Sequence, residues 1–267
     1  MRTCTSHKPT SLSSVLVSLA LVIASSFLAA CGGSAASVPA VQTYQYKPFL
    51  ALHVCGDNTL SYPVQFLQEA ARNLADRIDS YVSPNMGGMF VDFSLIEANS
   101  LQNTFVTFSV PAIQNIPPKP QPGNDPYSYA KALSDWKKTV PMVNSLVSTV
   151  RASIKPSLDK MRSIHLQEVG GTDIPGCADT ASSEFSHFPN GNKLLLYISD
   201  LQSNIDVNVS KHINLYGAKV VVIFRPCQVQ SACEQNDAFW KQQFTAWDAS
   251  SVSFYSPAES EAEKITF

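Results

Sequence analysis

The feature that most constrains the fold is a set of short, nearly continuous apolar segments that alternate with amphipathic ones. Three of them, "FLALHVC" (49–55), "KLLLYI" (193–198) and "AKVVVIF" (218–224), have the length of strands. Apolar runs of this kind are typical of parallel strands that are covered on both faces. Residues 64–81 instead repeat their apolar side chains at helical spacing. This alternation predicts an α/β domain with a doubly wound, mainly parallel sheet and helices on both faces.

The other segments fit the same scheme. Residues 89–96 and 104–110 alternate in polarity and are separated by few residues, which predicts a hairpin with one antiparallel edge strand. Residues 236–247 predict a helix, and residues 252–255 a final short strand. The aromatic residues of that helix recur at i, i+4 and i+7 and are assigned to the core rather than to a cofactor site: Trp240, Phe244 and Trp247.

A proline-rich stretch separates the predicted hairpin from a long helical region. Residues 111–126 contain six prolines and are expected to form an extended surface loop, either a stiff connector or a recognition segment for a partner. Residues 127–165 are helical in pattern and read as an elaboration of the domain. Pro141 and Pro156 interrupt the pattern, which predicts two or three helical pieces.

The N-terminus resembles a bacterial lipoprotein signal. Arg2 and Lys8 precede an apolar stretch that ends in "LAAC", with Cys31 in the position of the acylated cysteine. The resemblance implies a signal peptide over residues 1–30, a flexible tether over 31–46 and a folded domain over 47–267. It also implies an exported protein that is lipid-anchored to a bacterial membrane at the cell envelope. An ordinary secretory signal, in which Cys31 is incidental, is the alternative.

Charge and cysteine content narrow the class of protein, and the cysteine content agrees with export. Without Arg2 and Lys8 the mature chain carries 17 basic and 21 acidic residues, a net charge of −4, which argues against nucleic acid as a partner. Four cysteines remain besides Cys4 and Cys31, an even number for an oxidising compartment. Of the three pairings, Cys227–Cys233 with Cys55–Cys177 is favoured because the first closes a short loop. A zinc site is the competing interpretation, but no CxxC pair supports it.

Three predicted loops carry carboxylates and hydroxyls at one edge of the sheet. The first strand is followed by the pattern Asp-x-Thr-x-Ser, "GGTDI" contains a threonine after paired glycines, and "YISDL" ends another buried strand. Ligands of parallel sheets bind at the carboxyl ends of the strands. Hard oxygen donors without sulfur or imidazole favour Mg²⁺ or Mn²⁺. The candidate metal residues are Asp57, Thr59, Ser61, Thr172 and Asp200.

This order of elements and motifs resembles the von Willebrand factor type A (vWA) domain over roughly residues 48–255. The resemblance implies a metal-ion-dependent adhesion site (MIDAS) that is built from those five residues. Leu60 and Leu201 stand where the family frequently has glycine. The alternative is structural: Asp57 could cap a helix, the two hydroxyls after it could be ordinary turn residues, and Thr172 or Asp173 could cap the following helix.

The expected function is that of a lipid-anchored binding module rather than an enzyme. A protein partner or another acidic ligand would supply a carboxylate to the bound ion, and the membrane would be contacted through the N-terminal lipid only. A metal-free scaffold in an envelope complex is the alternative. Metal-assisted hydrolysis is a third hypothesis, but the sequence has no GxSxG, HExxH or phosphate-binding glycine loop. Arg225 is expected near the same edge of the sheet, and no histidine is assigned a role.

Overall fold

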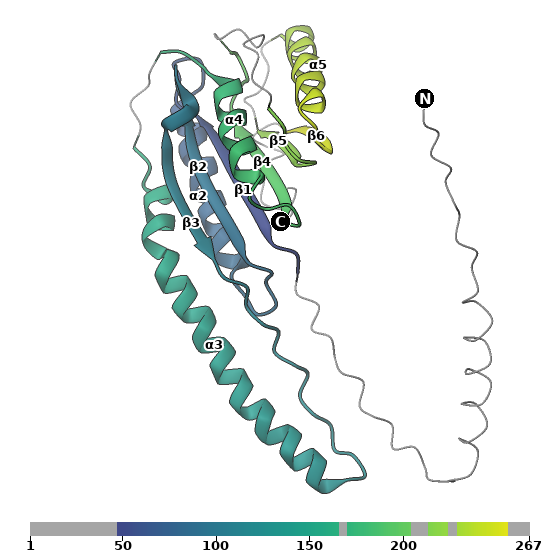
Figure 1. Ribbon diagram of the computed structural model, residues 1–267. Helices are drawn as coiled ribbons and strands as arrows, with labels where there is room; N and C mark the ends of the chain where they lie inside the picture. The colour runs from purple at the N-terminus through teal and green to yellow at the C-terminus, as the bar shows by residue number, and fades with distance from the viewer. Residues whose placement is uncertain (1–46, 166–169, 204–212, 224–228, 256–267) are drawn as a thin grey trace, which may run out of the picture. The chain divides into compact units, whose positions relative to one another are not determined.

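The computed structural model describes residues 47–165, 170–203, 213–223 and 229–255. Figure 1 shows a six-stranded sheet with the strand order β3-β2-β1-β4-β5-β6. In chain order the strands are β1 (Leu50–Asp57), β2 (Met89–Ile96), β3 (Thr104–Val110), β4 (Asn192–Ile198), β5 (Lys219–Ile223) and β6 (Ser251–Tyr255). β3 pairs antiparallel with β2, and each of the other neighbouring pairs is parallel. The predicted doubly wound sheet with one antiparallel edge strand is confirmed.

β1 lies in the middle of the sheet, which explains its continuous apolar sequence. It pairs with β2 on one side and with β4 on the other, so that Leu50 lies beside both Met89 and Asn192. All eight residues of the strand are buried. Since successive side chains of a strand point to opposite faces, both faces of β1 have to be apolar where helices cover them.

Helices cover both faces of the sheet. α2 (Val64–Tyr81) and α3 (Pro126–Arg162) pack on one face and share a hydrophobic core with alternate residues of β1 and β2. α4 (Ile174–Phe185) and α5 (Gln230–Ala246) contribute to a second core on the other face. In Figure 1, α2 lies behind the sheet and α4 in front of it. A short 3₁₀ helix, η1 (Ser100–Gln102), connects β2 to β3.

α3 is one helix of 37 residues, so the prediction of two or three helical pieces was wrong. The reason is that Pro141 and Pro156 lie on its exposed side. Each proline leaves the carbonyl four residues earlier without its helical partner, but Lys137 and Ala152 are exposed too and their carbonyls can bind water. A buried stripe holds the rest of the helix against the domain: Val143, Val150, Ile154, Leu158 and Met161.

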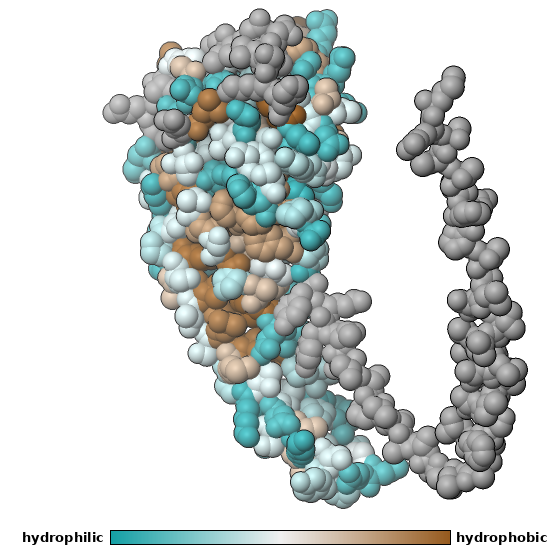
Figure 2. Space-filling model, in the orientation of Figure 1, coloured by the Kyte–Doolittle hydropathy of each residue, from teal (hydrophilic) through white to brown (hydrophobic). Residues whose placement is uncertain are grey.

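The first half of α3 extends beyond the sheet, and the proline-rich segment runs beside it (Figure 1). Residues 111–125 have almost no regular structure, as predicted, and α3 begins at Pro126 with Asp125 as its cap. The indole nitrogen of Trp136 donates a hydrogen bond to the carbonyl of Pro117 at 2.9 Å. Figure 2 shows that this projecting end carries mainly hydrophilic residues. This contact holds the segment against the helix.

The aromatic stripe of α5 and one disulfide are also confirmed. Trp240 and Phe244 are buried, and Trp247 packs against them. α5 begins at Gln230, six residues before the predicted start. Cys55 and Cys177 form a disulfide.

Several predictions lie outside the described residues. Cys233 is disulfide-bonded, but Cys227, its predicted partner, is not among the described residues, and neither are Arg225, the signal peptide, Cys31 and the tether. None of the described helices is long and apolar enough to cross a membrane.

Candidate metal site

Two of the predicted loops leave neighbouring strands at the same edge of the sheet. Asp57 is the last residue of β1, and Asp200 follows the end of β4 at Ile198. β1 and β4 are parallel and pair Gly56 with Ile198, so their carboxyl ends coincide. This is the edge at which ligands of parallel sheets bind. The five predicted ligands, Asp57, Thr59, Ser61, Thr172 and Asp200, are called the rim cluster below.

The first loop is organised around the carboxylate of Asp57. Its Oδ1 accepts hydrogen bonds from the backbone nitrogen of Thr59 at 3.1 Å and from the Thr59 hydroxyl at 2.6 Å. The Thr59 and Ser61 hydroxyl oxygens lie 3.1 Å apart. The hydroxyl of Ser199, from the loop after β4, donates to Asp57 Oδ2. The structure thus brings Asp57, Thr59 and Ser61 into one connected group.

Asp57 does not cap a helix. α2 begins at Val64, and its capping residue is Pro63, which makes no side-chain cap. The capping alternative is therefore wrong for Asp57, because the carboxylate is fully buried and bonds to its own loop and to the loop after β4.

Burial and a like charge both disfavour the ionised form of Asp57. Removal from water raises the pKa of this carboxyl, and hydrogen bonds from Ser199 and Thr59 partly oppose that shift. The negative charge of Asp200 raises the pKa of Asp57 further. A divalent cation between the two loops would reverse both effects, since it would attract both carboxylates.

The second loop brings Thr172 to the same edge through Gly171. Gly171 has a φ of +91°, and a Cβ at this position would lie 2.7 Å from the Cβ of Ala98. Only glycine fits here without strain. Thr172 is 1% exposed, and its carbonyl accepts a hydrogen bond from the hydroxyl of Ser203, which follows Asp200 by three residues. The loop of Thr172 and the loop of Asp200 are thus joined directly.

Asp173, rather than Thr172, caps α4. Its Oδ1 accepts a hydrogen bond from the backbone nitrogen of Gly176 at 2.8 Å, and its Oδ2 accepts one from the backbone nitrogen of Ser100 at 3.2 Å. The capping alternative therefore holds for Asp173.

The two departures from the family pattern have different structural outcomes. Leu60 is not among the residues with positive φ, so its position does not require glycine, and its side chain is 71% exposed. Leu201 has a φ of +54°, the conformation that favours glycine and that costs other residues about 1–2 kcal/mol. Its buried side chain packs in the second core, and its carbonyl accepts a hydrogen bond from Trp240 Nε1 at 2.8 Å. Burial and this bond offset the strain.

The donor set of the rim cluster suits a hard divalent cation. Two carboxylates and three hydroxyls offer oxygen atoms alone, and Mg²⁺ or Mn²⁺ prefers such ligands. Asp57, Ser61, Thr172 and Asp200 would hold the ion directly or through water, and Thr59 would orient Asp57. The bound ion would supply an electrophilic centre that attracts an incoming oxygen.

One cluster was not predicted from the sequence. On the α4 side of the sheet, His53 Nδ1 lies 2.7 Å from Glu184 Oε2 and 3.4 Å from Asp92 Oδ2. These three residues are called the buried triad below. The available signal was an ionisable residue inside each of two strands, His53 in "FLALHVC" and Asp92 in "MFVDFSLI".

No protein-family model and no curated protein matches the sequence. Among solved structures, the chain resembles proximal thread matrix protein 1 from the mussel byssus in a form with a zinc-occupied MIDAS motif. The TM-score is 0.41 and the identity 13%, over 80% of this chain and 43% of that one. For a von Willebrand factor type A structure from Catenulispora acidiphila, the TM-score is 0.38 and the identity 12%, over 80% of this chain and 40% of that one. For an aerotolerance-related membrane protein from Bacteroides fragilis, the TM-score is 0.34 and the identity 12%, over 78% of this chain and 90% of that one.

The chain spans less than half the length of the mussel and Catenulispora structures. The order of its own elements decides the fold. A strand that ends in Asp57, a helix, two strands, the Thr172 loop, a helix and the strand before Asp200 come in the order that the resemblance implies, with α3 inserted before the Thr172 loop. The described part of the chain has a doubly wound α/β fold whose elements follow the order that the vWA resemblance implies.

Proposed function

We propose that this domain is a binding module that holds a divalent cation, Mg²⁺ or Mn²⁺, at the rim cluster and binds an acidic group of a partner through it. The observation that carries the proposal is the buried Asp57 carboxylate, which is hydrogen-bonded to Thr59 and Ser199 and repelled by Asp200. A purely structural carboxylate gains nothing from a second carboxylate nearby. Two carboxylates that share a cation are both stabilised by being close to each other.

The mechanism is completion of the ion's coordination by a partner carboxylate. Mg²⁺ usually keeps several waters, and one of them can be exchanged for an oxygen atom from outside the protein. Leu60 lies between two residues of the rim cluster and exposes 71% of its surface. An apolar side chain beside a charged contact would select partners that carry an apolar group next to the carboxylate.

The module acts at the bacterial cell envelope, where Cys31 attaches it to the membrane and residues 31–46 serve as a tether. The proposed role is binding rather than catalysis, since the sequence has no GxSxG, HExxH or phosphate-binding glycine loop. The proposed partner is a protein with an accessible aspartate or glutamate.

Thermal unfolding of the purified chain in EDTA, Mg²⁺, Mn²⁺ and Zn²⁺ tests the ion. At 100 times its dissociation constant an ion adds about 2.7 kcal/mol to the free energy of unfolding. For a domain of this size that corresponds to about 5–10 °C in Tm. Asp57→Ala should abolish the Mg²⁺ shift, whereas Asp135→Ala, at an exposed position of α3, should keep it. An unchanged Tm in Mg²⁺ and Mn²⁺ would favour the metal-free scaffold.

The carboxylate contact is tested by NMR with labelled leucine methyl groups. An aspartate-containing peptide should shift the Leu60 methyl signals in Mg²⁺ and leave them in place in EDTA. Equal shifts in both buffers would show binding that does not use the ion.

A further inference from the structure

We propose that the buried triad, His53, Asp92 and Glu184, is a second, internal site for a first-row divalent cation such as Zn²⁺. The three residues come from β1, β2 and α4. His53 and Asp92 are cross-strand partners in the register of β1 and β2. His53 precedes Asp57 by four residues, so the triad lies roughly 13 Å along the strand from the rim cluster.

The ligand atoms of the triad already converge. His53 Nδ1, a carboxylate oxygen of Asp92 and one of Glu184 all lie within 4.8 Å of one another. Two ligands of a tetrahedral Zn²⁺ at 2.0–2.1 Å are roughly 3.3 Å apart. The 3.4 Å between His53 Nδ1 and Asp92 Oδ2 matches that spacing. The 2.7 Å to Glu184 Oε2 is the length of a hydrogen bond, and this side chain would have to move by roughly 0.6 Å.

Charge balance favours a cation at this place. With a neutral imidazole the triad carries two negative charges on the sheet face under α4, and the Asp92 side chain is 2% exposed. In the described part of the chain, neither carboxylate forms an ion pair with lysine or arginine. Buried carboxylates without compensating charge are costly, and one divalent ion balances both of them.

The donor types separate this site from the rim cluster. One imidazole nitrogen and two carboxylate oxygens suit Zn²⁺ and its neighbours in the first transition row, whereas the rim cluster offers oxygen alone. The Glu184 side chain is 21% exposed, so one ligand of the site reaches solvent.

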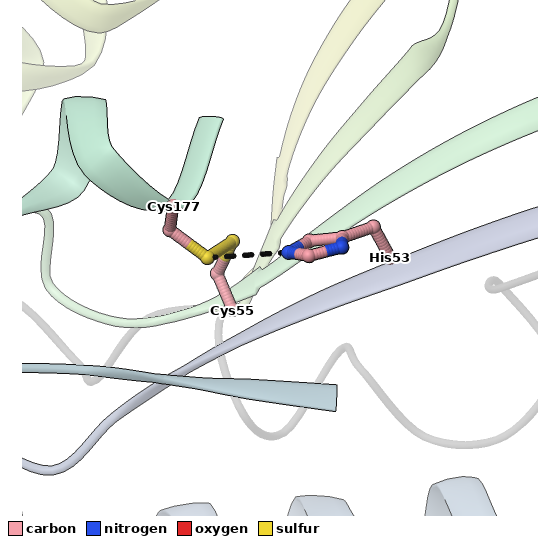
Figure 3. Close-up of side chains that lie close together, drawn as sticks. All are labelled: His53, Cys55 and Cys177. Carbon is pink, nitrogen blue, oxygen red and sulfur yellow. Dashed lines mark hydrogen bonds between the residues drawn. A yellow bond between two sulfur atoms is a disulfide. The ribbon is translucent and has the colours of Figure 1, made fainter. Parts of the chain in front are cut away.

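Surrounding contacts hold two of the three ligands in place. The hydroxyl of Ser94 donates to Asp92 Oδ2 at 2.6 Å. The second ring nitrogen of His53 faces the disulfide, with Nε2 3.5 Å from Cys177 Sγ (Figure 3). Because that sulfur is bonded to Cys55, it is not a thiolate ligand. The ion would therefore bind at Nδ1, with Nε2–H directed at the sulfur. Such outer contacts orient a metal-binding histidine.

Zinc binding in the full chain with Asp57→Ala tests the site, because this substitution disables the rim cluster. Isothermal titration with ZnCl₂ should give one ion per chain, and ¹⁵N NMR should show a shift of the His53 Nδ1 signal. Asp92→Asn in the same background should weaken zinc binding at least 100-fold. Glu184→Gln should weaken it as much, and because this side chain is partly exposed, its substitution should disturb the hydrophobic core less. Asp135→Asn is the matched control and should bind as the Asp57→Ala parent does.

Circular dichroism verifies that each variant is folded. The proposal is overturned if the Asp57→Ala chain binds no zinc, or if folded Asp92→Asn and Glu184→Gln variants bind it as well as their parent. Loss of stability in these variants without any zinc binding would also overturn it, since the triad would then be only a structural contact. The Tm shift of the unsubstituted chain in Mg²⁺ is not used to judge these outcomes. The proposals for the two ion sites are therefore tested independently of each other.

Discussion

The rim cluster and the buried triad both take a residue from β1, yet they are built in different ways. The rim cluster comes from the loops after β1 and β4 and from the loop before α4, and within its first loop its members are two residues apart in the sequence. The triad comes from the middle of two strands and from α4, and Glu184 is 131 residues from His53. Donors that are close in the sequence make a visible motif, whereas donors that are joined by sheet register do not.

The two clusters also differ in what supports them. Hydrogen bonds between neighbouring loops position Asp57, so the rim cluster depends on loop conformation. Strand pairing and the packing of α4 position the triad. The Cys55–Cys177 disulfide lies between the two, since Cys55 is two residues from Asp57 and Cys177 touches His53. Each prediction below separates or links the two clusters.

The largest effect is expected for removal of this disulfide. Cys55→Ala with Cys177→Ala should lower the free energy of unfolding by about 2–5 kcal/mol, as is typical for a native bridge. Urea denaturation measures the change. Because the bridge contacts His53 and starts two residues before Asp57, we expect weaker binding of Mg²⁺ and of Zn²⁺ as well. A loss below about 1 kcal/mol with unchanged ion binding would show that sheet and helices alone position the two clusters.

The substitution Asp57→Asn should have opposite effects with and without Mg²⁺. Burial raises the pKa of Asp57, so the folded protein binds a proton there more readily than the unfolded chain. Ionisation of Asp57 therefore destabilises the fold progressively as pH rises above the unfolded value of 3.8. In EDTA, Asp57→Asn should gain stability relative to the unsubstituted chain between pH 4 and pH 7.

At pH 7, excess Mg²⁺ should stabilise the unsubstituted chain but not Asp57→Asn. The variant lacks the contribution of about 2.7 kcal/mol that the ion makes at 100 times its dissociation constant. Urea titrations at several pH values, with EDTA or with Mg²⁺, measure both parts. A relative stability that does not change with pH would contradict the raised pKa. The Zn²⁺ site at the triad should be unaffected in every condition.

Gly171→Ala should damage the rim cluster alone. The new Cβ would meet Ala98 at 2.7 Å at a φ of +91°, which costs about 1–3 kcal/mol and displaces Thr172. Denaturation and Mg²⁺ titration measure the loss. Gly170→Ala is the matched control, because nothing lies within 4 Å of its added Cβ and its φ is not positive. Equal stability and equal Mg²⁺ affinity of the two variants would exclude a role for the Gly171 backbone conformation.

Ser94→Ala should have the smallest effect and should act on the triad alone. Loss of the 2.6 Å hydrogen bond to Asp92 should cost about 1 kcal/mol of stability. It should also weaken Zn²⁺ binding at least tenfold, because outer contacts tune metal affinity. Ser80→Ala, which removes an exposed hydrogen bond to the Asp76 carbonyl, is the control. Unchanged zinc affinity in Ser94→Ala would show that Asp92 needs no support.

Much of the sheet could be predicted from the sequence, because its strands carry continuous or alternating apolar residues. The bounds of α2, β2 and β3 agree with their predicted ranges, since their apolar spacing follows one period from end to end. α3 could not be predicted, because whether a proline breaks a helix depends on which side faces water. That information arises only when the buried stripe of α3 meets α2 and β3.

The connected group of Asp57, Thr59 and Ser61 could be predicted because these residues form one local motif. The Cys55–Cys177 bridge agrees with the pairing that the sequence favoured among three. The buried triad could not be predicted, because a single histidine in an apolar strand gives no hint of its partners. Only the register that pairs His53 with Asp92 and the packing of α4 bring the carboxylates to it. Leu201 also needed the structure, since its left-handed backbone is compensated by contacts with α5.

The disulfide has a topological consequence for the first half of the domain. Cys55 and Cys177 are 122 residues apart, so the bridge closes a covalent ring that contains α2, β2, β3 and α3. The stretch between β3 and α3, much of it exposed, lies inside this ring. A protease that cuts once between residues 111 and 125 opens the ring but releases no fragment. The two pieces of the nicked protein stay covalently joined until a reductant cleaves the disulfide.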